Sequence, residues 1–422
     1  MKLYQRVLRK SLDLIISSQF RHILLRIVGL NNYISLIMKS LDIRGNVLAK
    51  KKILCVERRY FEKDVDELSH RVRKYGWIWL KKSQLTAYQD QILPRKYIGQ
   101  KKYHKYINDA PEIWAECISR SKILLKRLKE EQNVCALMIA NINYWQDYAL
   151  QIACKELKIP VIVLQKEYPY NNLDYYKSFK KYYTKDFNPS ADALMVYGER
   201  AKNIYLETKT FDANKIFVTG PPRLDRWRSI ENYKEKSGEL LILPFRNDEN
   251  KIEPFLDILV VISNFIKNKN LGNIIIKSRD KIQTIELRNF CDKQKIDNVV
   301  IIDFANIYDI VPQSKVIVGL TSMATIECML SKVPIIIPDW IIRNKNKKLF
   351  DPNDENCFKS LEFSNNMDDL LKRIMIHLND NNSQINDKTY EERKKFISRF
   401  WDHDPSTTAC SKVQKVIDEL VN

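Results

Sequence analysis

Beyond residue 50 the chain alternates short apolar runs, rich in β-branched residues, with amphipathic segments of helical length. Six of these runs precede residue 222, and we expect them to be strands: Ile53–Val56, Trp77–Leu80, Val134–Ala140, Val161–Leu164, Leu194–Tyr197 and Ile216–Thr219. Strands that alternate with helices are typical of βαβ units around a parallel sheet. The first half of the chain is therefore expected to form one such sheet.

The same pattern repeats from residue 239. The expected strands are Leu240–Leu243, Asn273–Lys277, Val299–Ile302, Val316–Val318 and Pro334–Ile337. The expected helices are Pro254–Lys267, Lys281–Lys293, Met323–Ser331, Met367–Leu378, Tyr390–Trp401 and Ser406–Val421. We predict an α/β fold with two Rossmann-like domains facing a cleft, at 51–222 and 239–390, joined by a polar linker at 223–238 and followed by terminal helices at 391–422.

Residues 1–50 form a basic segment that we expect to be helical and amphipathic. Within residues 1–40, Lys and Arg alternate with Leu, Ile and Val at helical spacing. Such a helix suits an anionic membrane surface, or it packs on the core and leaves a basic face in water. The sequence leaves both alternatives open.

The amino-acid composition excludes some classes of protein but does not identify the function. The 422 residues are 45% hydrophobic and 29% charged, as in a folded protein, and the net charge of +19 favours a polyanionic partner. The eight cysteines never form a Cys-x-x-Cys pair and the nine glycines never form Gly-x-Gly, which argues against a zinc site, a P-loop and a dinucleotide fingerprint. No apolar run approaches the roughly 18 residues of a membrane span, so a cytoplasmic protein is expected.

Polar residues that directly follow strands are the candidates for chemistry, because doubly wound sheets bind ligands at the carboxyl ends of their strands. Glu167 follows the strand at 161–164 and could serve as a general base. The alternative is a surface loop in which Glu167 pairs with Lys166. Arg246, Lys277 and Arg279 follow two neighbouring strands, where cations would suit a donor phosphate.

The strand at 316–318 runs through Gly319 into Thr321 and Ser322, which can cap the next helix. A helix N-terminus with two hydroxyls can hold a phosphate, and Glu327 one turn later could accept hydrogen bonds from a sugar. An ordinary capped helix is the alternative. In the turn from Thr219 to Asp225 we expect a structural role, with Arg223 and Asp225 paired across the turn.

Three segments carry a resemblance to a known family: Gly319 to Pro334, Thr219 to Asp225, and Arg399 to Ala409. They resemble bacterial surface-carbohydrate transferases of the GT-B fold, which take part in capsule and lipopolysaccharide biosynthesis, and more distantly the CDP-glycerol glycerophosphotransferases. The resemblance covers roughly residues 134–422. Five histidines occur, none at an expected first-domain strand end, which favours sugar transfer over glycerol phosphate transfer.

The resemblance implies a glycosyltransferase that moves a sugar from a nucleotide-activated donor to a surface-polysaccharide or lipid-linked acceptor. It implies Glu167 as the catalytic base, no metal and no cofactor, because the nucleotide sugar is a substrate. It also implies a donor site in the second domain, an acceptor site in the first, and a place at the inner face of the bacterial inner membrane. The donor site would comprise Arg246, Lys277, Arg279, Thr321, Ser322, Thr325 and Glu327.

Two other functions remain open. A UDP-sugar 2-epimerase shares the two-domain architecture and needs no acceptor. A nucleic-acid-binding protein would fit the net charge, but the basic residues are dispersed and no nucleic-acid-binding motif appears, so no specific nucleic acid is expected.

Overall fold

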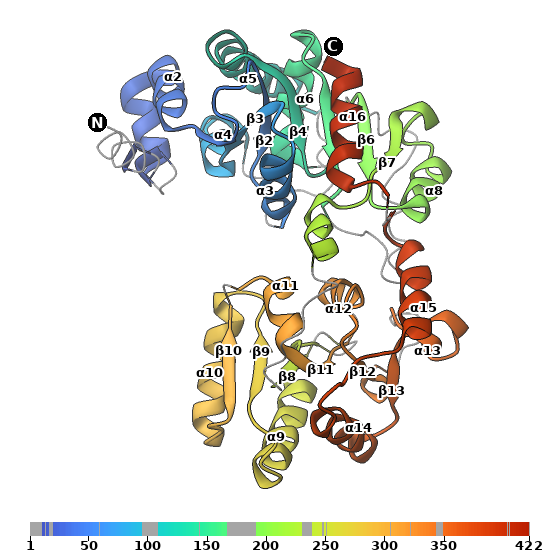
Figure 1. The fold of residues 1–422 in the computed structure, drawn as a ribbon. Helices are drawn as coiled ribbons and strands as arrows, with labels where there is room; N and C mark the ends of the chain where they lie inside the picture. Colours follow the sequence, from blue (N-terminus) through green and yellow to red (C-terminus); the bar gives the residue numbers. More distant parts are fainter. Residues whose placement is uncertain are drawn as a thin grey trace. The chain divides into compact units, whose positions relative to one another are not determined.

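The computed structural model describes most of the chain, and it divides into two compact units. The first holds the described residues up to Asp225 together with those from Asp404 onward, and the second holds 226–402 (Figure 1). The described residues are 11–12, 14–16, 20–58, 60–94, 109–142, 144–166, 191–229, 239–246, 249, 251–303, 305–320, 322–342, 349–402, 404 and 406–421.

A seven-stranded sheet forms the middle of the first unit, in the order β1-β3-β2-β4-β5-β6-β7. All neighbours are parallel except β1 and β3, which are antiparallel. Three strands, β3, β5 and β6, are buried along their whole length, as expected when helices cover both faces of a parallel sheet. The strands are β1 (Asp42–Gly45), β2 (Lys51–Val56), β3 (Tyr75–Leu80), β4 (Val134–Ile139), β5 (Val161–Leu164), β6 (Ala193–Val196) and β7 (Ile216–Val218).

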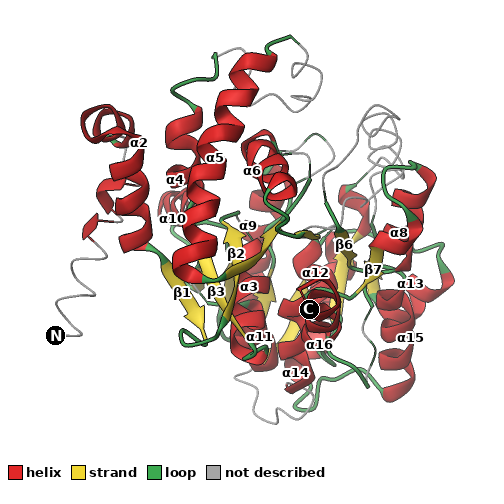
Figure 2. Ribbon diagram, turned by 90° about the horizontal axis from the view of Figure 1, so that it is seen from above, coloured by secondary structure: helices red, strands yellow, loops and turns green. Residues whose placement is uncertain are grey.

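Helices cover both faces of this sheet, as Figure 2 shows for α5 and α6 on one side and α3 and α16 on the other. Side chains of α3 and α16 share one apolar core with alternate residues of β2, β3 and β4, including Ile53, Trp77 and Val413. The helices of this unit are α2 (Arg21–Ser40), α3 (Phe61–Arg71), α4 (Lys82–Gln89), α5 (Pro111–Gln132), α6 (Trp145–Glu156), α8 (Glu199–Glu207) and α16 (Ala409–Val421).

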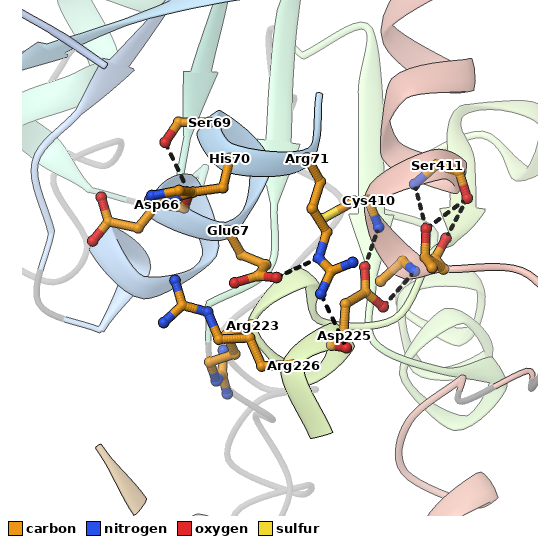
Figure 3. A network of polar contacts seen from close by, with 12 residues as sticks. Asp66, Glu67, Ser69, His70, Arg71, Arg223, Asp225, Arg226, Cys410 and Ser411 are labelled. Carbon is orange, nitrogen blue, oxygen red and sulfur yellow. Dashed lines mark hydrogen bonds and ion pairs between the residues drawn. The ribbon is translucent and has the colours of Figure 1, made fainter. Parts of the chain in front are cut away.

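The C-terminal helix α16 is tied to the first unit by a buried carboxylate. Asp225, in the 3-10 turn Pro222–Ser229, accepts hydrogen bonds from the backbone N–H groups of Ala409 and Cys410, both at 2.9 Å (Figure 3). These are first-turn amides of α16, so the carboxylate satisfies orphan donors and lies at the positive end of the helix dipole. Arg71, paired with Glu67, donates to the Asp225 carbonyl oxygen at 3.4 Å.

The second unit contains a wholly parallel six-stranded sheet in the order β10-β9-β8-β11-β12-β13. Its strands are β8 (Glu239–Ile242), β9 (Ile274–Lys277), β10 (Val299–Ile302), β11 (Ser314–Val318), β12 (Ile335–Pro338) and β13 (Glu362–Ser364). Its helices are α9 (Glu253–Asn268), α10 (Lys281–Gln294), α11 (Ile307–Ile310), α12 (Met323–Cys328), α13 (Glu355–Ser360), α14 (Met367–Asn379) and α15 (Asp387–Ser398). Side-chain caps fix where several begin, as when Asp280 accepts from the Gln283 amide of α10.

A buried arginine braces the connection between α12 and β12. Arg393 of α15 is almost completely buried and donates to the carbonyl oxygens of Ser331, Val333 and Ser360 at 2.7–2.9 Å. Its burial lowers the pKa of its guanidinium to about 9. Because three backbone acceptors surround it, Arg393 joins α15 to the ends of α12 and α13.

The N-terminal helix α2 is two helical pieces that meet at Gly29, whose φ of 75° and ψ of 165° are not helical. The second piece packs against the unit through Tyr33, Ile34 and Ile37, which are fully buried. The first piece packs through Leu25, while Ile23 and Ile27 remain exposed. One face of this helix is therefore packed and the opposite face lies in solvent, and its contact with a membrane stays a prediction.

The predicted strands form as strands, within a residue or two at their ends, but β1 and β13 were not predicted. The 3-10 turn at 222–229 occupies the start of the predicted linker, and the two units divide between Asp225 and Arg226. The terminal helices fall in different units, α15 in the second and α16 in the first. No helix in the described part of the chain is long and apolar enough to span a membrane.

Candidate functional site

The second unit's sheet has a topological switch point between β8 and β11. When the strands are numbered along the chain, their order across the sheet is 3-2-1-4-5-6. The chain therefore continues from β8 to β9 and β10 on one side of β8, while β11, β12 and β13 lie on its other side. In open α/β sheets, ligands bind outside the carboxyl ends of the strands at this point. We call the ends of β8 and β11, where Leu243 and Gly319 follow, the second switch point.

The loop after β11 is built by its own hydroxyl groups. Ser322 caps α12 by accepting from the Thr325 amide at 3.1 Å, and the Thr325 hydroxyl donates to the Leu320 carbonyl oxygen at 2.8 Å. Gly319 lies so close that a Cβ atom there would be 2.8 Å from the Thr325 hydroxyl oxygen. Thr325 is completely buried, and its hydroxyl shapes the loop.

The predicted helix Met323–Ser331 is shorter than expected, because α12 ends at Cys328. Ser322 and Glu327 are half-buried at its two ends. Thr321, also predicted to bind the donor, lies outside the described residues. The structure therefore places three of the four predicted residues of this loop, and their part in donor binding stays a prediction.

Three predicted cations lie at or after the carboxyl ends of β8 and β9, which are neighbours in the sheet: Lys277 is the last residue of β9, and Arg246 and Arg279 follow β8 and β9. Arg246 and Arg279 are exposed. The Lys277 ammonium is half-buried and donates to the carbonyl oxygens of Ser278 at 2.7 Å and Asp303 at 2.9 Å, which joins the ends of β9 and β10. The topology thus brings the three cations to the same sheet edge as Ser322, and phosphate oxygens are the acceptors that such cations bind best.

The first unit has an equivalent switch point between β2 and β4. When its strands are numbered along the chain from β2 onward, their order across the sheet is 2-1-3-4-5-6, so the chain passes from β2 to β3 on one side while β4 and the later strands lie on the other side of β2. We call the ends of these two strands the first switch point. Arg58, just after β2, donates from Nη2 to Oδ1 of Asp147 in the first turn of α6. Both side chains are almost entirely buried. Burial raises the pKa of Asp147 to about 6, while Arg58 opposes the rise.

Two cations lie over one aromatic ring at the first switch point. The Arg58 guanidinium carbon is 5.0 Å and the Lys166 ammonium 5.6 Å from the centre of the Tyr144 ring. Lys166 follows β5, so β2, β4 and β5 each contribute to this group. Glu167, the predicted base, is the next residue in the chain and lies outside the described residues.

A second ion pair stands farther along the same edge. Arg223 donates to Asp64 of α3 twice, from its backbone N–H at 3.0 Å and from Nη1 at 2.8 Å. Nη1 also donates to the Tyr197 hydroxyl at 2.6 Å. The expected pairing of Arg223 with Asp225 across the turn is replaced by separate roles, since Asp225 caps α16.

Arg58, Tyr144 and Asp147 were not identified from the sequence, although one signal was available. Arg58 follows the predicted strand at 53–56, and Tyr144 comes four residues after the predicted strand at 134–140. Inspecting the residues after every expected strand, instead of after five selected strands, would have found both. The partner of Arg58 could not have been found this way, because Asp147 lies 89 residues away in a helix.

Comparisons with known proteins show which solved structures share the fold of this chain. No family model matches the sequence, and no curated protein matches it either. Among solved structures, a candidate UDP-N-acetylglucosamine 2-epimerase from Listeria monocytogenes is similar with a TM-score of 0.52 and 12% identity, over 87% of this chain and 96% of that one. This likeness confirms the predicted fold class, two parallel-sheet units of the GT-B type.

Two further structures align over similar lengths. The UDP-GlcNAc 2-epimerase from Methanocaldococcus jannaschii has 15% identity and a TM-score of 0.49, covering 87% of this chain and 99% of that one. The glycotransferase of kitacinnamycin has 12% identity and a TM-score of 0.48, covering 88% and 99%.

Proposed function

We propose that the protein is an enzyme that binds a nucleotide-activated sugar, with the nucleotide at the second switch point. The observation that carries this proposal is the 3-2-1-4-5-6 strand order of the second sheet. Arg246 and Ser322 follow the two strands of the switch point, and Arg279 follows β9, the other neighbour of β8. Exposed guanidinium groups beside a switch point suit the phosphates of such a ligand. UDP is the first nucleotide to test, because the Listeria protein named above is a candidate enzyme of a UDP-sugar.

Two reactions fit this ligand, and different observations favour them. The solved-structure comparison favours a UDP-sugar 2-epimerase, which inverts one sugar carbon and needs no acceptor. The resemblance of three sequence segments to surface-carbohydrate transferases favours transfer of the sugar to a second substrate. In either case we propose Glu167 as a general base, because it directly follows Lys166 in the sequence, after the strand β5.

The first experiment is a thermal-shift screen of the full chain with CMP, CDP, UDP, GDP and dTDP. A ligand that binds only the folded state raises the melting temperature as its site saturates. We expect a rise with one nucleotide and a smaller rise in the Arg279→Ala variant. If none of the five raises the melting temperature, the proposed nucleotide site is wrong.

The second experiment separates the two reactions. The nucleotide sugar that binds is incubated with the enzyme alone in D2O and followed by NMR. Epimerisation at a carbon that bears hydrogen gives a new stereoisomer with deuterium at C2, whereas a transferase leaves that carbon unchanged until an acceptor is added. Appearance of the isomer establishes the epimerase, and its absence together with acceptor-dependent release of nucleotide establishes the transferase.

A further inference from the structure

Exposed apolar side chains are concentrated at one place in the described part of the chain. Fourteen large hydrophobic side chains are exposed, and nine are spread singly or in pairs over both units. The other five fall within a stretch of fourteen residues: Leu14 (71% exposed), Ile15 (51%), Phe20 (59%), Ile23 (56%) and Ile27 (77%). Single exposed apolar residues are ordinary, but such a cluster marks an interaction site.

Two of the five, Ile23 and Ile27, share one face of the first piece of α2, and Phe20 is the N-cap residue just before it. Phe20, Ile23 and Ile27 are spaced three and four residues apart, which places them in a row along a helix. The opposite face is held on the protein. Leu25 is buried, and the His22 ring nitrogen Nδ1 lies 3.2 Å from the Ala87 carbonyl oxygen of α4.

The sequence that surrounds this row is basic. Residues 1–40 contain seven Lys and Arg residues and one acidic residue, Asp13. Arg26, beside Ile27, is exposed. A row of apolar side chains bordered by basic ones is the pattern of a helix that lies in the interface of an anionic membrane.

We propose that the first piece of α2 with its N-cap residue, residues 20–28, docks the protein on an anionic lipid surface through Phe20, Ile23 and Ile27. A second copy of the chain suits this face less well, because two such basic faces would repel each other. A nucleic acid would use the positive charge but leave the apolar row without a partner. The proposal also gives the proposed function a substrate class, and this part rests on that function: a lipid-linked acceptor, which an enzyme held at the bilayer surface would meet.

The test uses the full chain, without nucleotide, and vesicles of phosphatidylcholine alone or with 30% phosphatidylglycerol. We expect binding to the anionic vesicles that weakens, but persists, as the salt concentration rises, because the apolar part does not depend on salt. The variant I23D/I27D should bind at least tenfold more weakly. The matched control is I282D/I285D, which changes two isoleucines of α10 with nearly the same exposure, 79% and 58%, and should bind like the wild type.

A second variant, I23S/I27S, removes the apolar surface without adding negative charge, and it keeps the test valid if the aspartates disturb folding. It should also lose most binding while retaining the melting temperature. Three results would overturn the proposal: no binding of the wild type to anionic vesicles, equal loss in the α10 control, or conversion of an oligomer to a monomer by I23S/I27S. The nucleotide thermal shift, measured on the same proteins, tests the proposed function separately.

Discussion

At the first switch point Arg58 and Asp147 form a buried ion pair, whereas the charged groups at the second are held by the backbone or exposed. Arg58 and Asp147 are almost wholly removed from water and contact each other. At the second sheet, Arg246 and Arg279 are exposed, and Lys277 donates to two carbonyl oxygens. Breaking a buried ion pair leaves a charge without its partner in a medium of low polarity, while removing an exposed charge costs the fold little. The charged residues of the first switch point should therefore govern the stability of the fold, and those of the second should govern the affinity for the ligand.

The largest effect is expected at Glu167, the residue after Lys166. Glu167→Gln should lower turnover about 100- to 10,000-fold, the usual contribution of a general base, and leave the nucleotide thermal shift intact. Glu199→Gln is the control, because Glu199 is an exposed glutamate that begins α8 after β6. Normal turnover in Glu167→Gln would assign the base to another residue.

Two arginine variants test whether the charged residues of the first switch point contribute more to stability than those of the second. Arg58→Ala should lower the free energy of unfolding by about 4 kcal/mol, because Asp147 keeps its burial and loses its partner. Arg279→Ala, at the second sheet, should change it by less than about 0.5 kcal/mol. Denaturant unfolding followed by circular dichroism measures both. Equal losses in the two variants would contradict the distinction between the switch points.

The pH dependence of stability tests the burial of Asp147 at the first switch point. The folded-state pKa of Asp147, about 6, lies above its unfolded value, so the folded protein binds more protons between pH 4 and pH 6. The wild type should therefore lose stability relative to Asp147→Asn as the pH rises through this window, by about 3 kcal/mol in total. Parallel stability curves for the two proteins would show that Asp147 titrates normally.

The smallest effects concern ligand affinity. Arg279→Ala should weaken binding of the nucleotide about tenfold, as expected when one charged hydrogen bond is lost. Lys277→Ala should weaken it similarly and also lower the free energy of unfolding by about 1 kcal/mol, because its bonds to Ser278 and Asp303 are lost. Titration calorimetry combined with denaturant unfolding separates the two contributions. An Arg279→Ala protein with wild-type affinity would remove this arginine from the site.

The strands were predictable because buried parallel strands are continuous runs of β-branched residues, as in β9 and β12. The edge strands β1 and β13 are three or four residues long and carry charged residues, so they lack this signal. The position of Arg246, Lys277 and Arg279 near strand ends could be predicted because a strand end is visible in the sequence, while their part in ligand binding stays a prediction. The Arg58–Asp147 pair was not, because it depends on β2 and β4 being neighbours, and sheet order is a property of the three-dimensional fold.

The cap that Asp225 forms on α16 has a consequence for synthesis. The core of the first unit includes Val413 and Ile417, so this unit lacks part of its core until α16 has left the ribosome. The second unit, at 226–402, has all its strands available earlier. Domains usually fold in the order of their synthesis. In this protein the first unit is completed after the second, and until then its sheet exposes the apolar surface that α16 later covers.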